Sequence, residues 1–329
     1  MDNENTSNEM PEMGSRRFIS RRNFIAAAAA VGALGVLGST GLVGCAPKSS
    51  TSGATTKGET ESYDIVIIGA GGAGMAAALA AKETGVESLV ILEKEPSSGG
   101  NTQFSSSGMN ASETKFQKAQ GIEDSNELFA QETYVGGHNT GNMELITYMC
   151  DNSAEAIDWL DGMGITLDNI TTTGGMSVKR CHRPTDGSAV GRTLAPGLAK
   201  LVTDHGIELR LNSDVTSLIT DDSGAVTGVN VTDTSTNEEK VINAKAVIMA
   251  AGGLGSNPEM ITKYRPDLAG YVSTNQPGAT GDGYVMAEAV GAELIQMDQI
   301  QIHPTVDQGS GTLIAERIRG SGAILVNFE

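Results

Sequence analysis

The 329-residue chain has a formal net charge of −18, which argues against nucleic-acid binding and against electrostatic attachment to anionic lipid. If Cys45 belongs to a leader, Cys150 and Cys181 alone remain, too few for a disulfide framework. Attached c-type haem is not expected, because Cys-x-x-Cys-His is absent from the sequence. The pair Cys181-His182 lacks metal-site spacing, so both residues are interpreted as structural and no metal site is predicted.

Residues 1–45 are interpreted as an export leader. The segment Ser20–Ile25 resembles the twin-arginine signal, and a weakly apolar run, Ile25–Gly44, follows it. This run is rich in Ala and Gly, so a cleaved signal is favoured over a membrane span. Leu42–Cys45 resembles a lipoprotein cleavage box. We therefore predict export by the twin-arginine route to the outer face of the cytoplasmic membrane. Membrane attachment is then only through lipid on Cys45, with 46–62 as a flexible tether.

The stretch Tyr63–Glu93 has the pattern of a dinucleotide-binding unit. An apolar run, Ile65–Ile68, predicts a buried parallel strand. The pattern G-x-G-x-x-G follows, then an Ala-rich helix that ends near Gly85, and a second apolar run, Leu89–Leu92. A strand followed by the glycines, a helix, a second strand and the acidic residue Glu93 is a far more specific pattern than the glycines alone.

Each glycine of the pattern has a separate expected role. Gly69 allows the tight turn, Gly71 lets the backbone approach a pyrophosphate, and Gly74 lets the helix pack on the strand. The helix N-terminus then offers free N–H groups to the phosphates. Glu93 stands about twenty residues further on, where a carboxylate can accept hydrogen bonds from ribose hydroxyls.

The middle of the chain alternates between small-residue loops and helices. Gly99-Gly100 and Ser105–Gly108 form a loop suited to lie against a flat ligand. Apolar spacing predicts helices, and a further strand follows the last of them. The expected segments are helices 124–134, 142–160 and 194–204, a basic loop from Gly174 to Pro184, and a strand at Ile207–Leu211.

Short β runs then predict a β-meander inserted in the α/β frame, at Val215–Ile219, Val226–Val231 and Lys240–Ile242. A parallel-type strand, Ala246–Ala250, ends in Ala251-Gly252-Gly253, which again indicates close backbone approach to a ligand. Asp282 precedes an expected helix at 284–290, and capping that helix is its alternative role. A strand is expected at Glu293–Met297.

The motifs together resemble the flavoprotein subunits of fumarate reductase and succinate dehydrogenase, especially soluble flavocytochrome-type fumarate reductases and related enoate reductases. The resemblance covers Tyr63 to the last residue. It depends on GAGGAG, EKEP, GGN, GMNA, HRP, STNQPGATGDG, HPT and RGSGAILVN in that order. It implies a Rossmann-like FAD-binding domain over 63–302 and the start of a capping domain over 303–329.

The resemblance also implies which residues hold FAD. The pyrophosphate would contact the glycine loop, and the ribose would contact Glu93. The adenine would lie near Val215, and the flavin ring would contact the segment after Gly100. The implied set is Gly69, Gly71, Ala73, Gly74, Glu93, Asn101, Thr102, Ser106, Ser107, Gly108, Val215, Ala251, Gly252 and Asp282. Asn101 stands where membrane-complex relatives carry the histidine that bonds to FAD, so noncovalent FAD is implied.

By resemblance, the reaction is hydride transfer from flavin N5 to the β-carbon of an α,β-unsaturated carboxylate. His303 would hydrogen-bond the substrate, and Glu316 with Arg319 would pass a proton. Without the resemblance, Glu316 and Arg319 would be interpreted as a surface ion pair. The family pattern differs at Ser107, Leu313 and Ala315, where fumarate reductases carry glycine, methionine and threonine. We therefore expect that fumarate is not the best substrate.

The chain ends before the family's proton-donating arginine, so the sequence is interpreted as a C-terminally truncated piece that would not turn over by itself. An external electron donor, such as a cytochrome or a flavoprotein, is implied. Two alternatives stay open. The chain could support another FAD-dependent dehydrogenase or oxidase reaction on the same fold, or it could be a non-catalytic flavin-binding fragment.

Overall fold

The computed structural model describes residues 60–307, 309–314, 324 and 326. The expected leader, tether, Glu316 and Arg319 lie outside the described residues. Among the described helices, none is long and apolar enough to cross a membrane.

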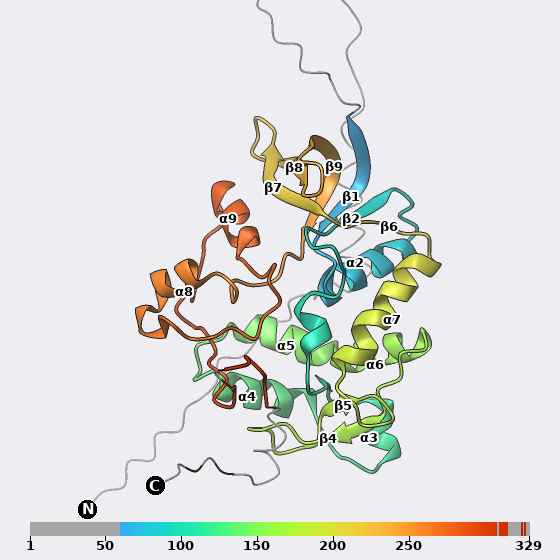
Figure 1. Cartoon of the computed structure of the whole chain (residues 1–329). Helices are drawn as coiled ribbons and strands as arrows, with labels where there is room; N and C mark the ends of the chain where they lie inside the picture. Colours follow the sequence, from blue (N-terminus) through green and yellow to red (C-terminus); the bar gives the residue numbers. More distant parts are fainter. Residues whose placement is uncertain (1–59, 308, 315–323, 325, 327–329) are drawn as a thin grey trace, which may run out of the picture. The chain divides into compact units, whose positions relative to one another are not determined.

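A six-stranded sheet occupies the upper part of the view in Figure 1. Its order is β6-β2-β1-β9-β8-β7. The strand β1 is parallel to both β2 and β9, and β2 is parallel to β6, whereas β7, β8 and β9 pair antiparallel. The bounds are β1 Glu61–Ile68, β2 Leu89–Leu92, β6 Glu208–Arg210, β7 Ser213–Thr220, β8 Val226–Asp233 and β9 Glu239–Met249. The predicted α/β fold, with a parallel sheet and a β-meander, is confirmed.

The long strand β9 corrects one boundary of the sequence prediction. The runs Lys240–Ile242 and Ala246–Ala250 were expected to be separate strands, but they form one strand to Met249. Ile242 pairs with Val229 of β8 on one side and with Glu61 of β1 on the other. The meander therefore shares its last strand with the parallel sheet.

Two helices cover one face of the sheet, α2 (Gly72–Glu83) and α7 (Gly191–Asp204), and they lie side by side in Figure 1. Alternate side chains of β1 point to opposite faces, so Ile67 packs with the helices while Val66 joins a second apolar cluster. That second cluster includes β8, β9 and Met286. Burial on both faces explains why the central strands are almost entirely apolar.

A small sheet and four helices form the part of the chain between β2 and α7. The sheet has the order β3-β5-β4, with β3 Met109–Asn110, β4 Asn169–Thr171 and β5 Cys181–Arg183. The helices are α3 Lys115–Ala119, α4 Asn126–Gly136, α5 Met143–Asp151 and α6 Ser153–Gly162.

Two expectations in this part were wrong. The single helix expected at 142–160 is two helices, broken at Asn152, which both ends α5 and begins α6. The expected basic loop contains β5, and its Arg180 is fully buried against Asp124 and Glu132.

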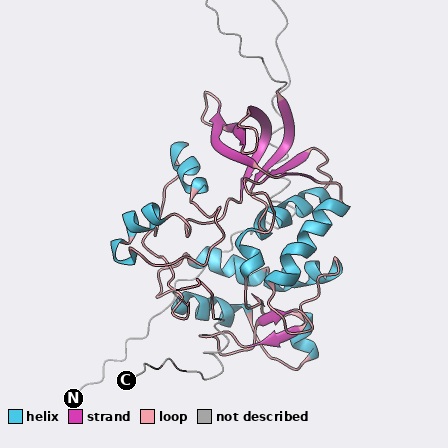
Figure 2. Ribbon diagram, in the orientation of Figure 1, coloured by secondary structure: helices cyan, strands magenta, loops and turns pink. Residues whose placement is uncertain are grey.

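The region after β9 consists of short elements joined by loops, as Figure 2 shows. The elements are α8 Pro258–Tyr264, the 3₁₀ helix η2 Pro266–Leu268 and α9 Asp282–Ala289. The helix expected at 284–290 therefore begins two residues earlier. The strand expected at Glu293–Met297 is wrong, because this segment has irregular structure.

Candidate functional site

A cavity of about 220 Å³ opens where β1, β2 and β9 end at their carboxyl edge. Parallel α/β sheets bind ligands at this edge. Ile68, Leu92 and Ala250 mark the three strand ends in its wall. Most of the residues predicted to hold the cofactor line it, namely Gly69, Gly71, Ala73, Glu93, Asn101, Thr102, Val215, Ala251, Gly252 and Asp282. The structure thus brings together residues that are as far apart as 69 and 282 in the sequence.

The glycines of the loop divide into two kinds. A Cβ on Gly69, where φ is +101°, would lie 2.5 Å from the Ala250 carbonyl oxygen. A Cβ on Gly74, which does not line the cavity, would lie 1.9 Å from the Gly69 carbonyl oxygen. In contrast, a Cβ on Gly71 or Gly252 would meet no described atom within 4 Å. Gly69 and Gly74 therefore allow close packing of the fold, while Gly71 and Gly252 leave open space at the cavity.

The N-terminus of α2 faces this space with little capping of its own. Its N-cap is Gly71, which has no side chain to accept from the first amides, and the first turn has no acidic residue. The Gly72 N–H donates to Thr102 Oγ1 at 3.1 Å. Unpaired first-turn amides and the positive end of the helix dipole together favour an anion.

Glu93 is fixed at the end of β2 and is only 8% exposed. Its Oε2 accepts from the Ala70 N–H at 2.7 Å, and its Oε1 accepts from the Glu95 N–H at 3.0 Å. A carboxylate has about four acceptor positions, so two backbone donors leave lone pairs for ligand hydroxyls. The same bonds tie the glycine loop to the strand end.

A charged group in the cavity wall was missed from the sequence. Lys94 Nζ donates to Thr280 Oγ1 at 2.6 Å and forms an ion pair with Asp282. Asp214 also lines the cavity; burial raises the pKa of its carboxyl, and Lys94 offsets part of that rise. The motif EKEP includes Lys94, but the role of this lysine was not predicted, because its partners lie more than 180 residues away along the chain.

Asp282 does not cap α9. The N-cap is Gly281, and the structure shows no side-chain cap bond at this helix start. The Asp282 carboxylate instead accepts from Thr280 Oγ1 at 2.9 Å and pairs with Lys94. Its alternative role as a helix cap alone is therefore wrong.

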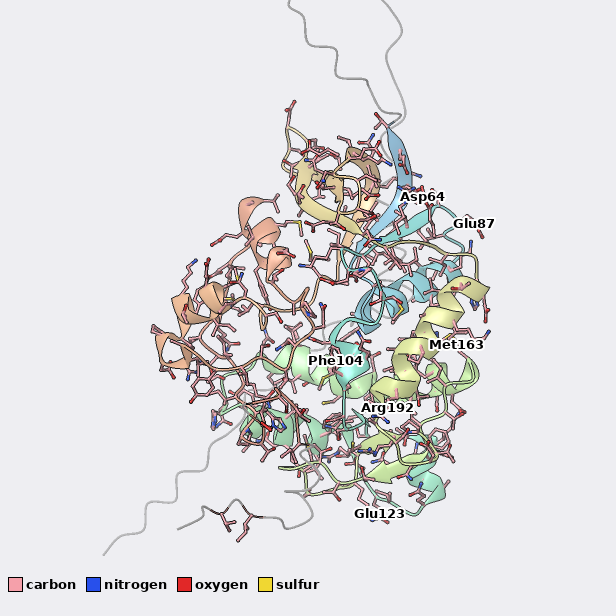
Figure 3. All side chains as sticks on the ribbon, viewed as in Figure 1. Asp64, Glu87, Phe104, Glu123, Met163 and Arg192 are labelled. Carbon is pink, nitrogen blue, oxygen red and sulfur yellow. The ribbon has the colours of Figure 1, made fainter. Side chains whose placement is uncertain are left out.

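Three predicted flavin contacts, Ser106, Ser107 and Gly108, are not among the residues that line the cavity. Ser107 Oγ lies 3.3 Å from Cys181 Sγ, and a Cβ on Gly108 would lie 2.4 Å from the His182 carbonyl oxygen. The loop is therefore packed tightly against β5. It follows η1 (Gly100–Phe104), a 3₁₀ helix whose last side chain, Phe104, is labelled in Figure 3 and is 55% exposed.

His303 is half-buried and lies outside the cavity wall. Its Nδ1 accepts from the Thr305 N–H at 3.3 Å. A backbone N–H only donates, so the neutral ring carries its proton on Nε2, which is then a donor. The proton-relay candidates Glu316 and Arg319 lie outside the described residues.

Cys181 and His182 have structural contacts. His182 Nε2 lies 2.8 Å from Thr114 Oγ1, and its Nδ1 lies 2.6 Å from the Arg180 carbonyl oxygen. Burial lowers the pKa of this imidazole. Across the residues that the structure describes, no group of three or more His, Cys, Asp or Glu side chains could hold a metal ion.

The residues that line the cavity have the chemistry that a dinucleotide needs. Gly71 and Gly252 leave room where a larger side chain would project, and uncapped amides stand where a diphosphate needs donors. Glu93 offers acceptors for ribose hydroxyls.

Comparisons with known proteins point in the same direction. A family model described as an FAD binding domain matches residues 64–329. The NADH:fumarate oxidoreductase of Klebsiella pneumoniae (strain 342) is 48% identical over 287 residues, covering 85% of this chain and 30% of that protein. The urocanate reductase of Eggerthella lenta is 42% identical over 266 residues, covering 78% and 43%.

Among solved structures, the open conformation of a flavocytochrome c3 fumarate reductase has a TM-score of 0.77 and 41% identity. The match covers 82% of this chain and 48% of that one. The chain thus spans about half or less of the length of these relatives.

Proposed function

The chain belongs to the FAD-binding domain family of the fumarate reductase flavoproteins, and from this membership we propose that it takes part in reducing the C=C bond of an α,β-unsaturated carboxylate. The observation that supports this most strongly is the cavity itself. Gly71 and Gly252 leave space for the cofactor beside the uncapped start of α2, and Glu93 is fixed at the strand end. When bound there, FAD supplies the hydride chemistry, and the protein supplies orientation and polarisation.

FAD is held without a covalent bond in this proposal. Asn101 lines the cavity, and an amide side chain has no ring nitrogen to bond to the cofactor. Acid precipitation of the purified protein should leave the yellow colour in the supernatant. Colour that stays with the pellet would refute noncovalent binding.

His303 is proposed to hydrogen-bond the substrate carboxylate or carbonyl. The Thr305 N–H fixes the ring with a donor on Nε2, as this role requires. A donor aimed at developing negative charge contributes about 10²–10³ in kcat, so H303A should lose that much. The control is H205A, because His205 is exposed and bonds only its own helix end at Leu201. Equal rates for H303A and H205A would remove His303 from the mechanism.

The proposed substrate is an enoate with one carboxylate and an apolar or aryl tail. By resemblance, Ala315 stands where fumarate reductases carry a threonine that holds one fumarate carboxylate, so that hydroxyl donor is missing, and Leu313 replaces a methionine of the pattern. A lost bond to a charged group costs roughly 1.5–3 kcal/mol, which is ten- to a hundredfold in binding. A relative at 42% identity is named urocanate reductase, which is consistent with acceptors other than fumarate.

Turnover of the full-length protein with reduced viologen tests this function. A panel of fumarate and of alkyl and aryl enoates should show the highest kcat/KM for a monocarboxylate, and A315T should raise fumarate turnover. A protein that prefers fumarate to every other enoate would refute the substrate class. A protein that reduces none of them would refute the reaction.

The electron donor is proposed to be external, a cytochrome or another flavoprotein. A solved structure with a similar fold is named as a flavocytochrome, which supports the first choice. Export by the twin-arginine route, with lipid on Cys45, is part of the same proposal and rests on Arg21, Arg22 and the residues before Cys45.

A further inference from the structure

We propose that Lys94 and Asn101 are positioning residues that fasten the segment Asn275–Asp282 over the cofactor cavity and so determine how fast FAD leaves. The inference deepens the proposed function, because it concerns the same cavity. It rests on two sets of bonds that both connect the first part of the domain to this one segment. We call them the lysine clasp and the asparagine clasp.

The asparagine clasp uses both ends of one amide. Asn101 Nδ2 donates to Asn275 Oδ1 at 2.6 Å, and the Gln276 N–H donates to Asn101 Oδ1 at 2.7 Å. This two-point contact fixes both the position and the direction of the segment. Asn275 is held in turn, because its N–H and its Nδ2 each donate to Ser273 Oγ at 3.1 Å.

The lysine clasp holds the other end of the segment. Lys94 Nζ bonds Thr280 Oγ1 at 2.6 Å and pairs with Asp282, with the lysine side chain 23% exposed. The segment lies close to the strand end between the clasps. A Cβ on Gly278 would be 2.6 Å from Glu95 Oε1 and 2.9 Å from Lys94 Cε.

The clasped segment is a wall of the cavity. Gln276, Gly278, Ala279 and Asp282 line it, together with Gly71 and Ala73 of the glycine loop. A bound cofactor would lie between this segment and the loop. If the segment holds the cofactor from this side, loss of either clasp should speed the release of FAD.

The experiment measures FAD release from the full-length protein as the rise of free-flavin fluorescence after dilution. K94Q and N101A should each accelerate release by roughly ten- to a hundredfold, the range for a lost charge-assisted or two-point hydrogen bond. K94R should restore most of the slow release, because it keeps a cation at Asp282. The matched controls lie outside the cavity wall: K82Q breaks the Lys82–Glu87 pair, whose lysine side chain is 21% exposed, and N169A removes a half-buried amide that donates to the Thr185 carbonyl oxygen.

A mutant cycle separates the clasp from general loss of stability. K94Q and T280V both remove the Lys94–Thr280 bond of the lysine clasp, so the double variant should release FAD no faster than about the faster single variant. High salt should accelerate release from the wild type and much less from K94Q, because salt screens a partly exposed ion pair. The salt dependence of release from the wild type can be measured even if a variant fails to fold, and no acceleration by salt would refute the lysine clasp.

The outcomes are distinct. Release rates of K94Q and N101A that equal those of the controls would refute the clasps while FAD binding stands. Faster release that is matched by the K82Q control, or that multiplies in the K94Q/T280V cycle, would also refute them. A wild-type protein that binds no FAD would refute the proposed function as well.

Discussion

At the scale of single residues, the glycine loop separates folding from cofactor binding. Gly71 has extended backbone, with φ −76°, and open space at its Cβ position. Gly74 has the Gly69 carbonyl oxygen 1.9 Å from its Cβ position. The two substitutions to alanine are chemically identical, so they form a matched pair with opposite expected readouts.

We predict that G71A folds normally and loses FAD, whereas G74A loses the fold. Alanine in place of an N-cap glycine costs about 1 kcal/mol or less, while overlap with a backbone oxygen costs about 3 kcal/mol or more. FAD affinity of G71A should fall at least about tenfold, which corresponds to about 1.4 kcal/mol. Chemical denaturation and FAD titration measure the two effects. Equal behaviour of the two variants in both assays would contradict the division of roles.

Asp214 gives a pH-dependent prediction. Burial raises the pKa of its carboxyl, so the folded state prefers the protonated form. The raised pKa stabilises the fold below the usual aspartate range, and this advantage is lost as pH rises through the folded pKa. At neutral pH the ionised carboxylate is therefore a cost to the fold.

D214N should consequently be more stable than the wild type at neutral pH, by less than about 1 kcal/mol because solvent still screens part of the charge. The difference should vanish as pH falls below the usual aspartate pKa. Denaturation midpoints across this pH range measure it, with D222N on the exposed β7–β8 turn as control. A D214N gain that grows toward acid pH would have the wrong sign.

At the scale of elements, β9 joins the two halves of the sheet. Ile242 is 1% exposed and pairs with β8 and β1 at once, whereas Val241 on the opposite face is 43% exposed. We predict that I242A costs about 2–5 kcal/mol of unfolding free energy, the range for a buried Ile to Ala change. V241A should cost less than about 1 kcal/mol. Denaturant unfolding of both variants tests this, and similar losses would show that β9 is not a core strand.

The elements that the sequence predicted well are those with local signals. The apolar run 89–92 became β2 with the same bounds, and α2 follows the glycine loop as expected. β9 was divided because Asn243-Ala244-Lys245 interrupts its apolar pattern, whereas its pairing with β1 continues through this segment and its pairing with β8 reaches Asn243. The break at Asn152 was missed because apolar spacing continues across it.

At the scale of the whole molecule, the site shows a similar division. Its glycines and Glu93 were predictable, because a strand, a turn and a helix create their chemistry within about thirty residues. Lys94 and the partners of Asn101 were not, because their contacts join residues more than 170 positions apart. The resemblance implied that Asp282 contacts the cofactor, but a single sequence carries no local trace of its pairing with Lys94 or of the bonds from Asn101, so these contacts became visible only in the fold.

The export proposal makes a prediction that depends on the whole molecule. Twin-arginine export carries folded proteins, so the leader and the fold must both be intact for the protein to leave the cytoplasm. R21K/R22K should stay inside because the signal is lost, and G74A should stay inside because its core is disrupted. G71A keeps its fold and should still be exported, unless cofactor loading is itself required. C45A should leave the cytoplasm but should not label with palmitate. Cell fractionation and labelling measure all four variants.

Export of R21K/R22K would refute the route, and palmitate on C45A would refute the lipid site. Retention of G71A together with G74A would show that the export machinery accepts only the FAD-loaded protein.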